Sequence, residues 1–266
     1  MNGRRTVLIT GASAGIGQAF AEVFAGNGFD LAIVARREDR LRALAASLEE
    51  RHRARVHVFT ADLAEADACI RLCERLDAAG VSIDALVNNA GFSVPGSFVS
   101  STWPRHADFL QVMLIAVVEL THRLLPGMLE RGYGRIINVA SLAGLLPAVA
   151  GHTLYAATKS FLIRFSESLS TEVQGRGVHV TALCPGFTFS EFHDVSGTRH
   201  IVSRMPPFMW MDADAVARQG YDAVMAGERV KVPGRVNAAI ATLGRLLPPR
   251  VVYAMNRRAA SRYRQT

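Results

Sequence analysis

The sequence of 266 residues predicts an α/β protein built on a doubly wound parallel sheet. Short apolar runs rich in Val and Ile alternate with longer amphipathic stretches through about the first 190 residues. The runs are apolar on both faces, as strands are when helices cover both sides of a parallel sheet. Their repeated alternation with helices favours right-handed crossovers within one sheet. No linker rich in Pro, Gly or Ser interrupts the pattern, so we expect one domain over residues 1–266.

The elements follow in order from length and pattern, because apolar runs of four to eight residues indicate strands and longer amphipathic stretches indicate helices. Strands are expected at residues 6–10, 31–35, 56–60, 85–89, 135–140 and 178–184. Helices are expected near residues 16–27, 38–52, 64–79, 103–131 and 154–175. A helix at 213–226 and a short strand at 229–232 complete the sheet.

Composition narrows the class of protein. Half of the residues are hydrophobic, enough for a sizeable core, and no stretch reaches about 18 consecutive apolar residues, which a membrane span would need. Three widely spread cysteines argue against a disulfide framework and for a reducing cytoplasm, and we expect no metal site. The net charge is +7, but the arginines are scattered and no nucleic-acid-binding module is visible, so we expect no nucleic-acid partner.

The first expected strand leads into a glycine-rich turn, "TGASAGIG" at residues 10–17. Gly11, Gly15 and Gly17 allow a tight turn and a close approach of backbone to ligand, and the helix that follows offers free N–H groups to a pyrophosphate. Placed between strand one and helix one, the motif predicts a nucleotide site that includes Ser13 and Ile16.

The second expected strand ends in "IVARRED". A carboxylate at this position binds the ribose hydroxyls of NAD, but here Arg36 and Arg37 stand in its place. Guanidinium groups suit a 2′-phosphate by charge and by forked hydrogen bonding, so the pair predicts NADP(H). An ordinary solvated helix start is the alternative.

Six motifs in order carry a resemblance to a known family. They are "TGASAGIG", "ADL" at 61–63, "NNAG" at 88–91, "NVASLAG" at 138–144, "YAATK" at 155–159 and "CPG" at 184–186. With these motifs the chain resembles the short-chain dehydrogenase/reductase family over residues 4 to about 192. The resemblance implies a Rossmann fold and a nicotinamide cofactor, and it assigns further cofactor contacts: Asp62 and Leu63 beside the adenine, Asn89, Ala90 and Gly91 along the cleft, Pro185 and Gly186 beside the nicotinamide, and Ser190 at the carboxamide, where the family usually has threonine.

The motif at residues 155–159 carries the expected chemistry. Tyr155 and Lys159 are four residues apart, so they share one helix face. An ammonium nearby is expected to lower the pKa of a phenol by ~1–3 units, which makes Tyr155 a candidate acid/base for a carbonyl or alcohol. Ser141 is the candidate donor to the same oxygen. The chain has 28 arginines and only two lysines, and a compact ammonium can bind ribose hydroxyls while facing the phenol.

One position departs from the family pattern. Met113 stands where the family usually places an asparagine that holds a water between the lysine and solvent, and a thioether cannot replace that amide. This departure leaves three alternatives. Another polar group carries the proton relay, the enzyme turns over slowly, or the chain binds cofactor without efficient turnover. We expect a working enzyme, with a regulatory or interaction protein of the same fold as the alternative.

The last third of the chain bears on substrate and partners. Residues 187–212 are rich in Phe, Met and Trp and are expected either to form a lid over an apolar pocket or to pack on the core. His193 and His200 are expected to be loop or surface residues. The basic, apolar-striped tail at 234–266 suits an anionic membrane, an oligomer contact or packing on its own domain. A hydrophobic ketone or aldehyde and its alcohol are the favoured substrates, and the resemblance implies a homodimer or homotetramer through the helices at 103–131 and 154–175.

Overall fold

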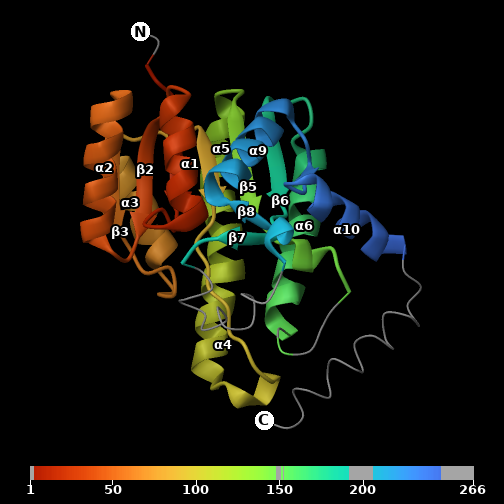
Figure 1. Ribbon diagram of the computed structural model, residues 1–266. Coiled ribbons are helices and arrows are strands. Elements are labelled where there is room, and N and C mark those ends of the chain that lie inside the picture. The colour runs from red at the N-terminus through yellow and green to blue at the C-terminus, as the bar shows by residue number, and fades with distance from the viewer. Residues whose placement is uncertain (1–2, 148–150, 152, 192–205, 247–266) are drawn as a thin grey trace.

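The computed structural model describes residues 3–147, 151, 153–191 and 206–246. Its centre is a parallel sheet of seven strands in the order β3-β2-β1-β4-β5-β6-β9 (Figure 1). The chain order reverses between β1 and β4, which is the position where open α/β sheets bind ligands. The doubly wound parallel sheet predicted from the sequence is therefore confirmed. Expected residues His193 and His200, and the tail beyond residue 246, lie outside the described residues.

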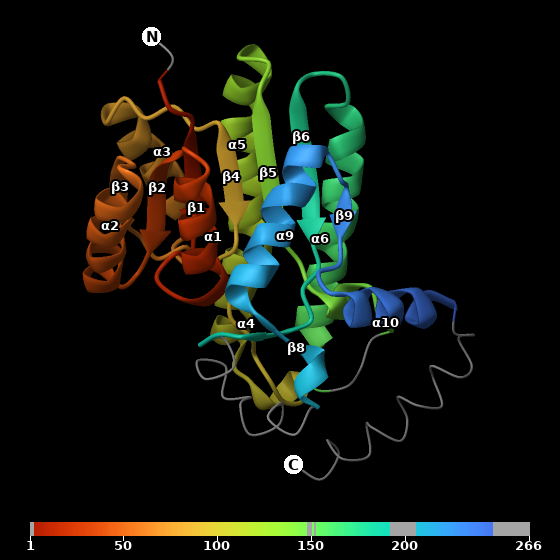
Figure 2. The same cartoon turned by 45° about the horizontal axis from the view of Figure 1, so that its top comes forward.

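The strands lie close to their expected positions. They are β1 Thr6–Thr10, β2 Asp30–Ala35, β3 Val56–Thr60, β4 Ala85–Asn88, β5 Gly134–Val139, β6 Val178–Leu183 and β9 Val230–Lys231. All six neighbouring pairs are parallel, so the carboxyl ends of the strands meet at one edge of the sheet (Figure 2). The strands are apolar on both faces because helices cover both faces.

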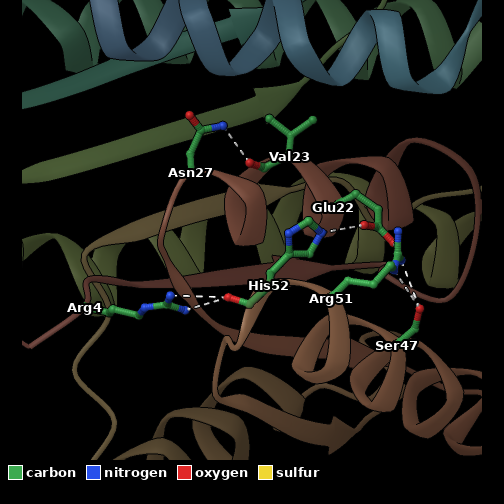
Figure 3. A network of polar contacts seen from close by, with 7 residues as sticks. All are labelled: Arg4, Glu22, Val23, Asn27, Ser47, Arg51 and His52. Carbon is green, nitrogen blue, oxygen red and sulfur yellow. Dashed lines mark hydrogen bonds and ion pairs between the residues drawn. The ribbon is translucent and has the colours of Figure 1, made fainter.

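Helices α1 Gly15–Gly26, α2 Glu38–His52 and α9 Ala213–Ala226 cover one face of the sheet. Phe24 of α1 is fully buried there, and its ring makes T-shaped, edge-to-face contacts with those of Phe29 and Tyr221 at 5.1 and 5.0 Å between centroids. A polar network joins α1 to α2 at the surface of this layer (Figure 3). Glu22 of α1 pairs with Arg51 and with His52 of α2.

Helices α3 Ala68–Ala78, α5 Ala116–Glu130 and α6 Thr153–Glu172 cover the other face. Helix α3 begins four residues later than the sequence predicts, because the carboxylate of Asp62 accepts a hydrogen bond from the Ala64 N–H and holds a turn there. In α6 the expected bounds 154–175 also contract, since a glycine-containing turn follows the helix.

The long helix expected at 103–131 is divided. Helix α4 Trp103–Leu110 and α5 are joined by a π-helical turn, η2 Gln111–Ile115, in which the Ala116 N–H reaches back to the Gln111 carbonyl. Together Trp103–Glu130 is long and apolar enough to cross a membrane, with a mean hydropathy of 1.5 in its most apolar window. In the fold it is a core helix, since Val112, Leu120 and Met128 are buried against the sheet.

The segment expected to form a lid, 187–212, contains a small sheet that the sequence did not predict. Strands β7 Phe187–Phe189 and β8 Trp210–Asp212 pair in parallel, and η4 Pro207–Met209 precedes β8. Residues 192–205 lie outside the described chain. Of the expected tail, α10 Arg235–Leu246 is described, and it lies at the carboxyl edge of the sheet (Figure 2).

One buried hydroxyl ties β1 to the end of β4. The Thr10 Oγ1 accepts hydrogen bonds from the backbone N–H groups of Asn89 and Ala90, each at 3.0 Å, and donates to the Val87 carbonyl at 3.3 Å. Thr10 is 2% exposed, so water cannot replace these bonds.

We expect Thr10→Val to lower the free energy of unfolding by about 2 kcal/mol, because the isosteric methyl leaves two N–H groups without their acceptor. Thr10→Ser keeps the hydroxyl and should lose much less. Urea unfolding of the three proteins measures the difference. A loss for serine and none for valine would show that the Thr10 methyl group, and not the hydroxyl, stabilises this junction.

Candidate active site

Loops at the carboxyl ends of the strands carry most of the residues that the sequence assigns to the site. The glycine turn follows β1, Arg36 and Arg37 follow β2, Asp62 and Leu63 follow β3, Asn89, Ala90 and Gly91 follow β4, Ser141 follows β5, and Pro185 and Gly186 follow β6. Because these strands are parallel neighbours, their loops gather along one edge of the sheet. Tyr155 and Lys159 reach the same edge from α6.

The glycine turn forms a cradle of bare backbone. Gly11 and Gly15 have positive φ angles of 67° and 56°, where side chains are strained. A Cβ atom on Gly11 would lie 2.8 Å from the Ala90 Cα, so the turn packs directly on the loop after β4. The Asn89 side chain fastens this contact by donating to the carbonyls of Thr10 at 3.0 Å and Gly11 at 3.3 Å. Asn89 thus shapes the cradle, whereas the sequence assigned it only to the cleft lining.

The start of α1 suits an anion. Within the described chain, Ala14 at the N-cap provides no side-chain cap, and the first turn contains no acidic residue. The N–H groups of this turn and the positive end of the helix dipole therefore remain available to a pyrophosphate. Ile16 packs its side chain against the core beneath the turn and leaves its backbone at the surface of the cradle. The cradle thus fits a dinucleotide.

The two arginines after β2 have different surroundings. The Arg37 guanidinium donates to the Ser13 Oγ from Nη2 at 3.0 Å and from Nε at 3.3 Å, which places it on the glycine turn. Arg36 is 70% exposed, and its nearest ionic partner is Asp62 at 3.7 Å. Arg37 and Ser13 therefore form the better-defined anion site, although the sequence treats the two arginines as equivalent. Leu63, beside Asp62, places its side chain in the core.

Ser141, Tyr155 and Lys159 are brought together at the end of β5. The Ser141 hydroxyl hydrogen-bonds the Tyr155 hydroxyl and also accepts from the Ala143 N–H at 3.1 Å. Lys159 is 6% exposed, and its Nζ donates to the Val139 carbonyl at 2.6 Å and lies 5.7 Å from the centroid of the Tyr155 ring. The Leu142 N–H donates to the Pro185 carbonyl at 2.9 Å, which joins this loop to the Pro-Gly turn.

The pKa values correct one expectation from the sequence. Burial raises the pKa of Tyr155 above its ordinary value, and the hydrogen bond from Ser141 opposes that rise only in part. Burial also lowers the pKa of Lys159 to about 8, against a small opposite effect of Cys184. The expected lowering of the Tyr155 pKa by Lys159 is therefore wrong, because desolvation of the phenol dominates.

Met113 lies in the π-helical turn and is 1% exposed. Its thioether covers Gly91 so closely that a Cβ atom at Gly91 would collide with the sulfur. The residue that departs from the family pattern therefore fills space behind the loop after β4. Because the side chain is buried and carries no donor, it contributes packing at this place and no hydrogen-bond relay.

The far end of the site is formed by the Pro-Gly turn and its neighbours. Pro185 is buried, and a Cβ atom on Gly186 would lie 2.5 Å from the Oδ1 of Asn237. Asn237 belongs to α10, is 3% exposed and donates to the Pro233 carbonyl at 3.0 Å. Ser190 lies against Gly15 at the other end of the cradle, since a Cβ atom on Gly15 would be 2.8 Å from the Ser190 Cβ.

Sequence reasoning missed three residues here: Asn237, Arg40 and Glu191. Asn237 and Glu191 come from segments about 50 and 150 residues away from their partners at Gly186 and Arg37, so no local pattern marks them. Arg40 follows Arg37 by three residues at the start of α2, and that i,i+3 spacing is a signal that would have found it.

We expect the buried ammonium of Lys159 to give the unfolding free energy a distinct pH dependence. Its folded-state pKa of about 8 lies below the ordinary 10.5, so between these pH values the unfolded chain binds more protons and stability rises with pH. Between pH 7.5 and 10.5, the free energy of unfolding of the wild type should rise by about 3 kcal/mol more than that of Lys159→Met. Denaturant unfolding across this range measures it. Lys231→Met, which removes the other lysine from a surface pair with Glu228, is the matched control. Identical pH slopes for wild type and Lys159→Met would contradict the desolvation of Lys159.

Comparisons with known proteins agree with this geometry. The family model described as short chain dehydrogenase matches residues 5–199. An uncharacterized oxidoreductase of Myxococcus xanthus is 33% identical over 256 residues, which are 96% of this chain and 97% of that protein.

Two solved structures are similar over most of their length. A short-chain dehydrogenase from Sphingobium yanoikuyae in complex with NADPH has a TM-score of 0.80 and 33% identity, covering 90% of this chain and 92% of that one. A bulky-bulky ketone specific alcohol dehydrogenase from Comamonas testosteroni has a TM-score of 0.75 and 28% identity, covering 92% and 95%. With the family model matching most of the chain and this fold and cradle in place, the chain belongs to the short chain dehydrogenase family.

Proposed function

We propose that this chain is an NADP(H)-dependent oxidoreductase that interconverts a hydrophobic ketone or aldehyde and its alcohol. The family acts on CH–OH and C=O groups. The observation that carries the proposal is the convergence of Ser141, Tyr155 and Lys159 at the sheet edge that also holds the glycine cradle and the Arg37–Ser13 pair.

Each of the three residues has a role that follows from its state. When bound, the nicotinamide supplies or accepts the hydride. Burial keeps the Tyr155 phenol protonated at neutral pH, so it gives its proton to a carbonyl oxygen in the reductive direction. Ser141 donates to the same oxygen and orients it. Lys159 is largely cationic below pH 8 and offsets the negative charge that develops on Tyr155 as the proton leaves.

The choice of NADP(H) rests on the anion site at Ser13 and Arg37. A serine hydroxyl and a forked guanidinium are donors of the kind that bind phosphate oxygens. The similar Sphingobium yanoikuyae protein was solved with NADPH, which supports the same cofactor here. Arg36, being exposed at the end of β2, adds charge and a surface for the adenine.

Aromatic residues beside the Pro-Gly turn support an apolar substrate. Trp210 of β8 packs against Phe187 and Phe189 of β7, with ring centroids 5.5 and 4.8 Å apart. Phe189 of β7 and Phe208 of the neighbouring η4 remain more than half exposed, so large apolar side chains are exposed on this small sheet and beside it. The similar Comamonas testosteroni protein is a bulky-bulky ketone specific alcohol dehydrogenase, which supports the same substrate class here.

Partners and location follow from the same surfaces. Ile115 at the π-helical turn and Phe161 on α6 are exposed apolar residues on the two helices that family members use to oligomerise, which supports a homodimer or homotetramer. We propose a cytoplasmic location. Membrane contact through residues 234–266 stays a prediction, because only residues 234–246 of the expected tail are described.

The rival proposal, a cofactor-binding regulatory protein, draws on Met113. The site argues against it, because Met113 displaces none of the three reacting side chains and Tyr155 remains hydrogen-bonded to Ser141. Turnover separates the two proposals directly.

We expect Arg37→Ala to weaken NADPH binding by about tenfold or more, because the loss of charge-assisted hydrogen bonds to phosphate costs on the order of 1.5–3 kcal/mol. NADH affinity should change little, and Arg36→Ala should have a smaller effect than Arg37→Ala. Fluorescence titration of both cofactors measures this. Arg42→Ala, which breaks an ion pair with Glu38 on the same helix, is the matched control. An equal loss for NADPH and NADH would rule out a 2′-phosphate site at Arg37.

We expect Tyr155→Phe to lower kcat/KM for NADPH-dependent reduction of an aryl ketone by about 100-fold or more, since general acid catalysis contributes that much. NADPH affinity should stay within a few-fold of wild type. Tyr133→Phe is the control: among the described residues its buried hydroxyl has no hydrogen-bond partner. NADPH binding without turnover in the wild type, unaffected by Tyr155→Phe, would favour the regulatory protein.

A further inference from the structure

We propose that the carboxylate of Glu191 occupies the guanidinium groups of Arg37 and Arg40, beside Ser13, and competes there with the 2′-phosphate of the cofactor. Glu191 would thereby set the degree to which the chain prefers NADPH over NADH. This inference rests on the proposed function, because it concerns the same cofactor site.

The carboxylate of Glu191 bridges two arginines at the start of α2. Its Oε2 accepts from the Arg37 Nη1 at 2.9 Å, and its Oε1 accepts from the Arg40 Nη1 at 2.6 Å. Both distances are those of charge-assisted hydrogen bonds. The other two nitrogens of the Arg37 guanidinium, Nε and Nη2, donate to the Ser13 Oγ. Two oxygens of one anion are thus held by two guanidinium groups, beside a serine hydroxyl of the glycine turn.

The same geometry would serve a phosphate monoester. A phosphate presents oxygens at similar spacing and carries more charge than a carboxylate, so it forms stronger bonds to the same donors. One guanidinium edge cannot bond fully to both anions, and two anions in contact repel each other. A 2′-phosphate therefore binds Arg37 and Arg40 only after the Glu191 carboxylate has moved away.

The fold places Glu191 beside the glycine turn. It lies 151 and 154 residues from its two partners, directly after Ser190, which packs against Gly15. Strand β7 precedes this pair and is fixed by its pairing with β8. The contact is therefore built by the tertiary fold, not by neighbours along α2.

The charge state and exposure of the group suit displacement. Hydrogen bonds from Arg40 and then Arg37 hold the pKa of the Glu191 carboxyl below its ordinary value, so it is anionic at neutral pH. The side chains of Arg37, Arg40 and Glu191 are each about 40% exposed. Exposed ion pairs are weak, so Glu191 reduces the affinity for the phosphate without blocking the site.

Only the phosphorylated cofactor has to displace this carboxylate. NADH carries a ribose hydroxyl in place of the phosphate and has no group that must take the Arg37 and Arg40 donors. Glu191 should therefore weaken NADPH binding and leave NADH binding nearly unchanged. It thereby reduces the preference of the chain for NADPH over NADH.

The test is a fluorescence titration of the full chain with NADPH and with NADH, in the wild type and in Glu191→Gln. The amide is isosteric but uncharged, so it bonds the arginines less strongly than the carboxylate does. We expect NADPH to bind about three- to tenfold more tightly in Glu191→Gln, as the loss of weak exposed ion pairs implies, and NADH to stay within about twofold.

Glu38→Gln is the matched control. It removes one carboxylate from the same end of α2, where Glu38 pairs with Arg42 and not with Arg37 or Arg40. Glu38→Gln should therefore tighten NADPH binding much less than Glu191→Gln. Equal tightening by both substitutions would overturn the competition and leave a general effect of net charge.

Two further outcomes overturn the inference and differ in what else they affect. If the wild type prefers NADPH and Glu191→Gln leaves NADPH binding unchanged or weakens it, Glu191 does not compete with the phosphate, and the proposed cofactor stands. Weaker binding in Glu191→Gln would show instead that Glu191 holds the arginines in place for the phosphate. If the wild type binds both cofactors equally and Arg37→Ala changes neither, the phosphate site itself is refuted, and the competition is refuted with it.

Discussion

The site depends on the burial of one ammonium group. Lys159 extends from α6 to the Val139 carbonyl at the end of β5, so its hydrogen bond ties the helix that carries Tyr155 to the strand that leads to Ser141. A buried ammonium needs few partners, whereas a guanidinium has five N–H donors that the same space would leave unpaired. This accounts physically for a lysine here in a chain that otherwise uses arginine. Its cost is the desolvation that lowers the pKa of Lys159.

The sequence was sufficient for the sheet, the glycine cradle and the grouping of Ser141, Tyr155 and Lys159, because each rests on a local pattern or on the rule that parallel strands share one carboxyl edge. It was insufficient for the π-helical turn at Met113, which lies inside a continuous helical pattern, and for the late start of α3, which one side-chain hydrogen bond of Asp62 accompanies. The unequal roles of Arg36 and Arg37 depend on contacts of Arg37 with Ser13 and Glu191. These partners are distant in the sequence, so no local sequence pattern predicts the contacts.

The protonation state of Tyr155 shows where sequence reasoning meets its limit. Spacing along a helix correctly places Tyr155 near Lys159, but the pKa of the phenol depends on how much water surrounds it. In the folded chain the loss of water outweighs the help of the neighbouring hydroxyl. A protonated phenol is the form that reduction of a carbonyl requires, so burial itself prepares the donor and the lysine acts on the charge that appears later.

The contact between Gly186 and Asn237 joins the turn after β6 to α10, the last helix of the described chain. The absence of a side chain at Gly186 makes room for the amide of Asn237, and α10 rests on that amide. The two positions are therefore coupled sterically, because a side chain at 186 would collide with the Asn237 amide unless residue 237 were smaller. Among relatives that keep this contact, we expect substitutions at the two positions to occur in pairs.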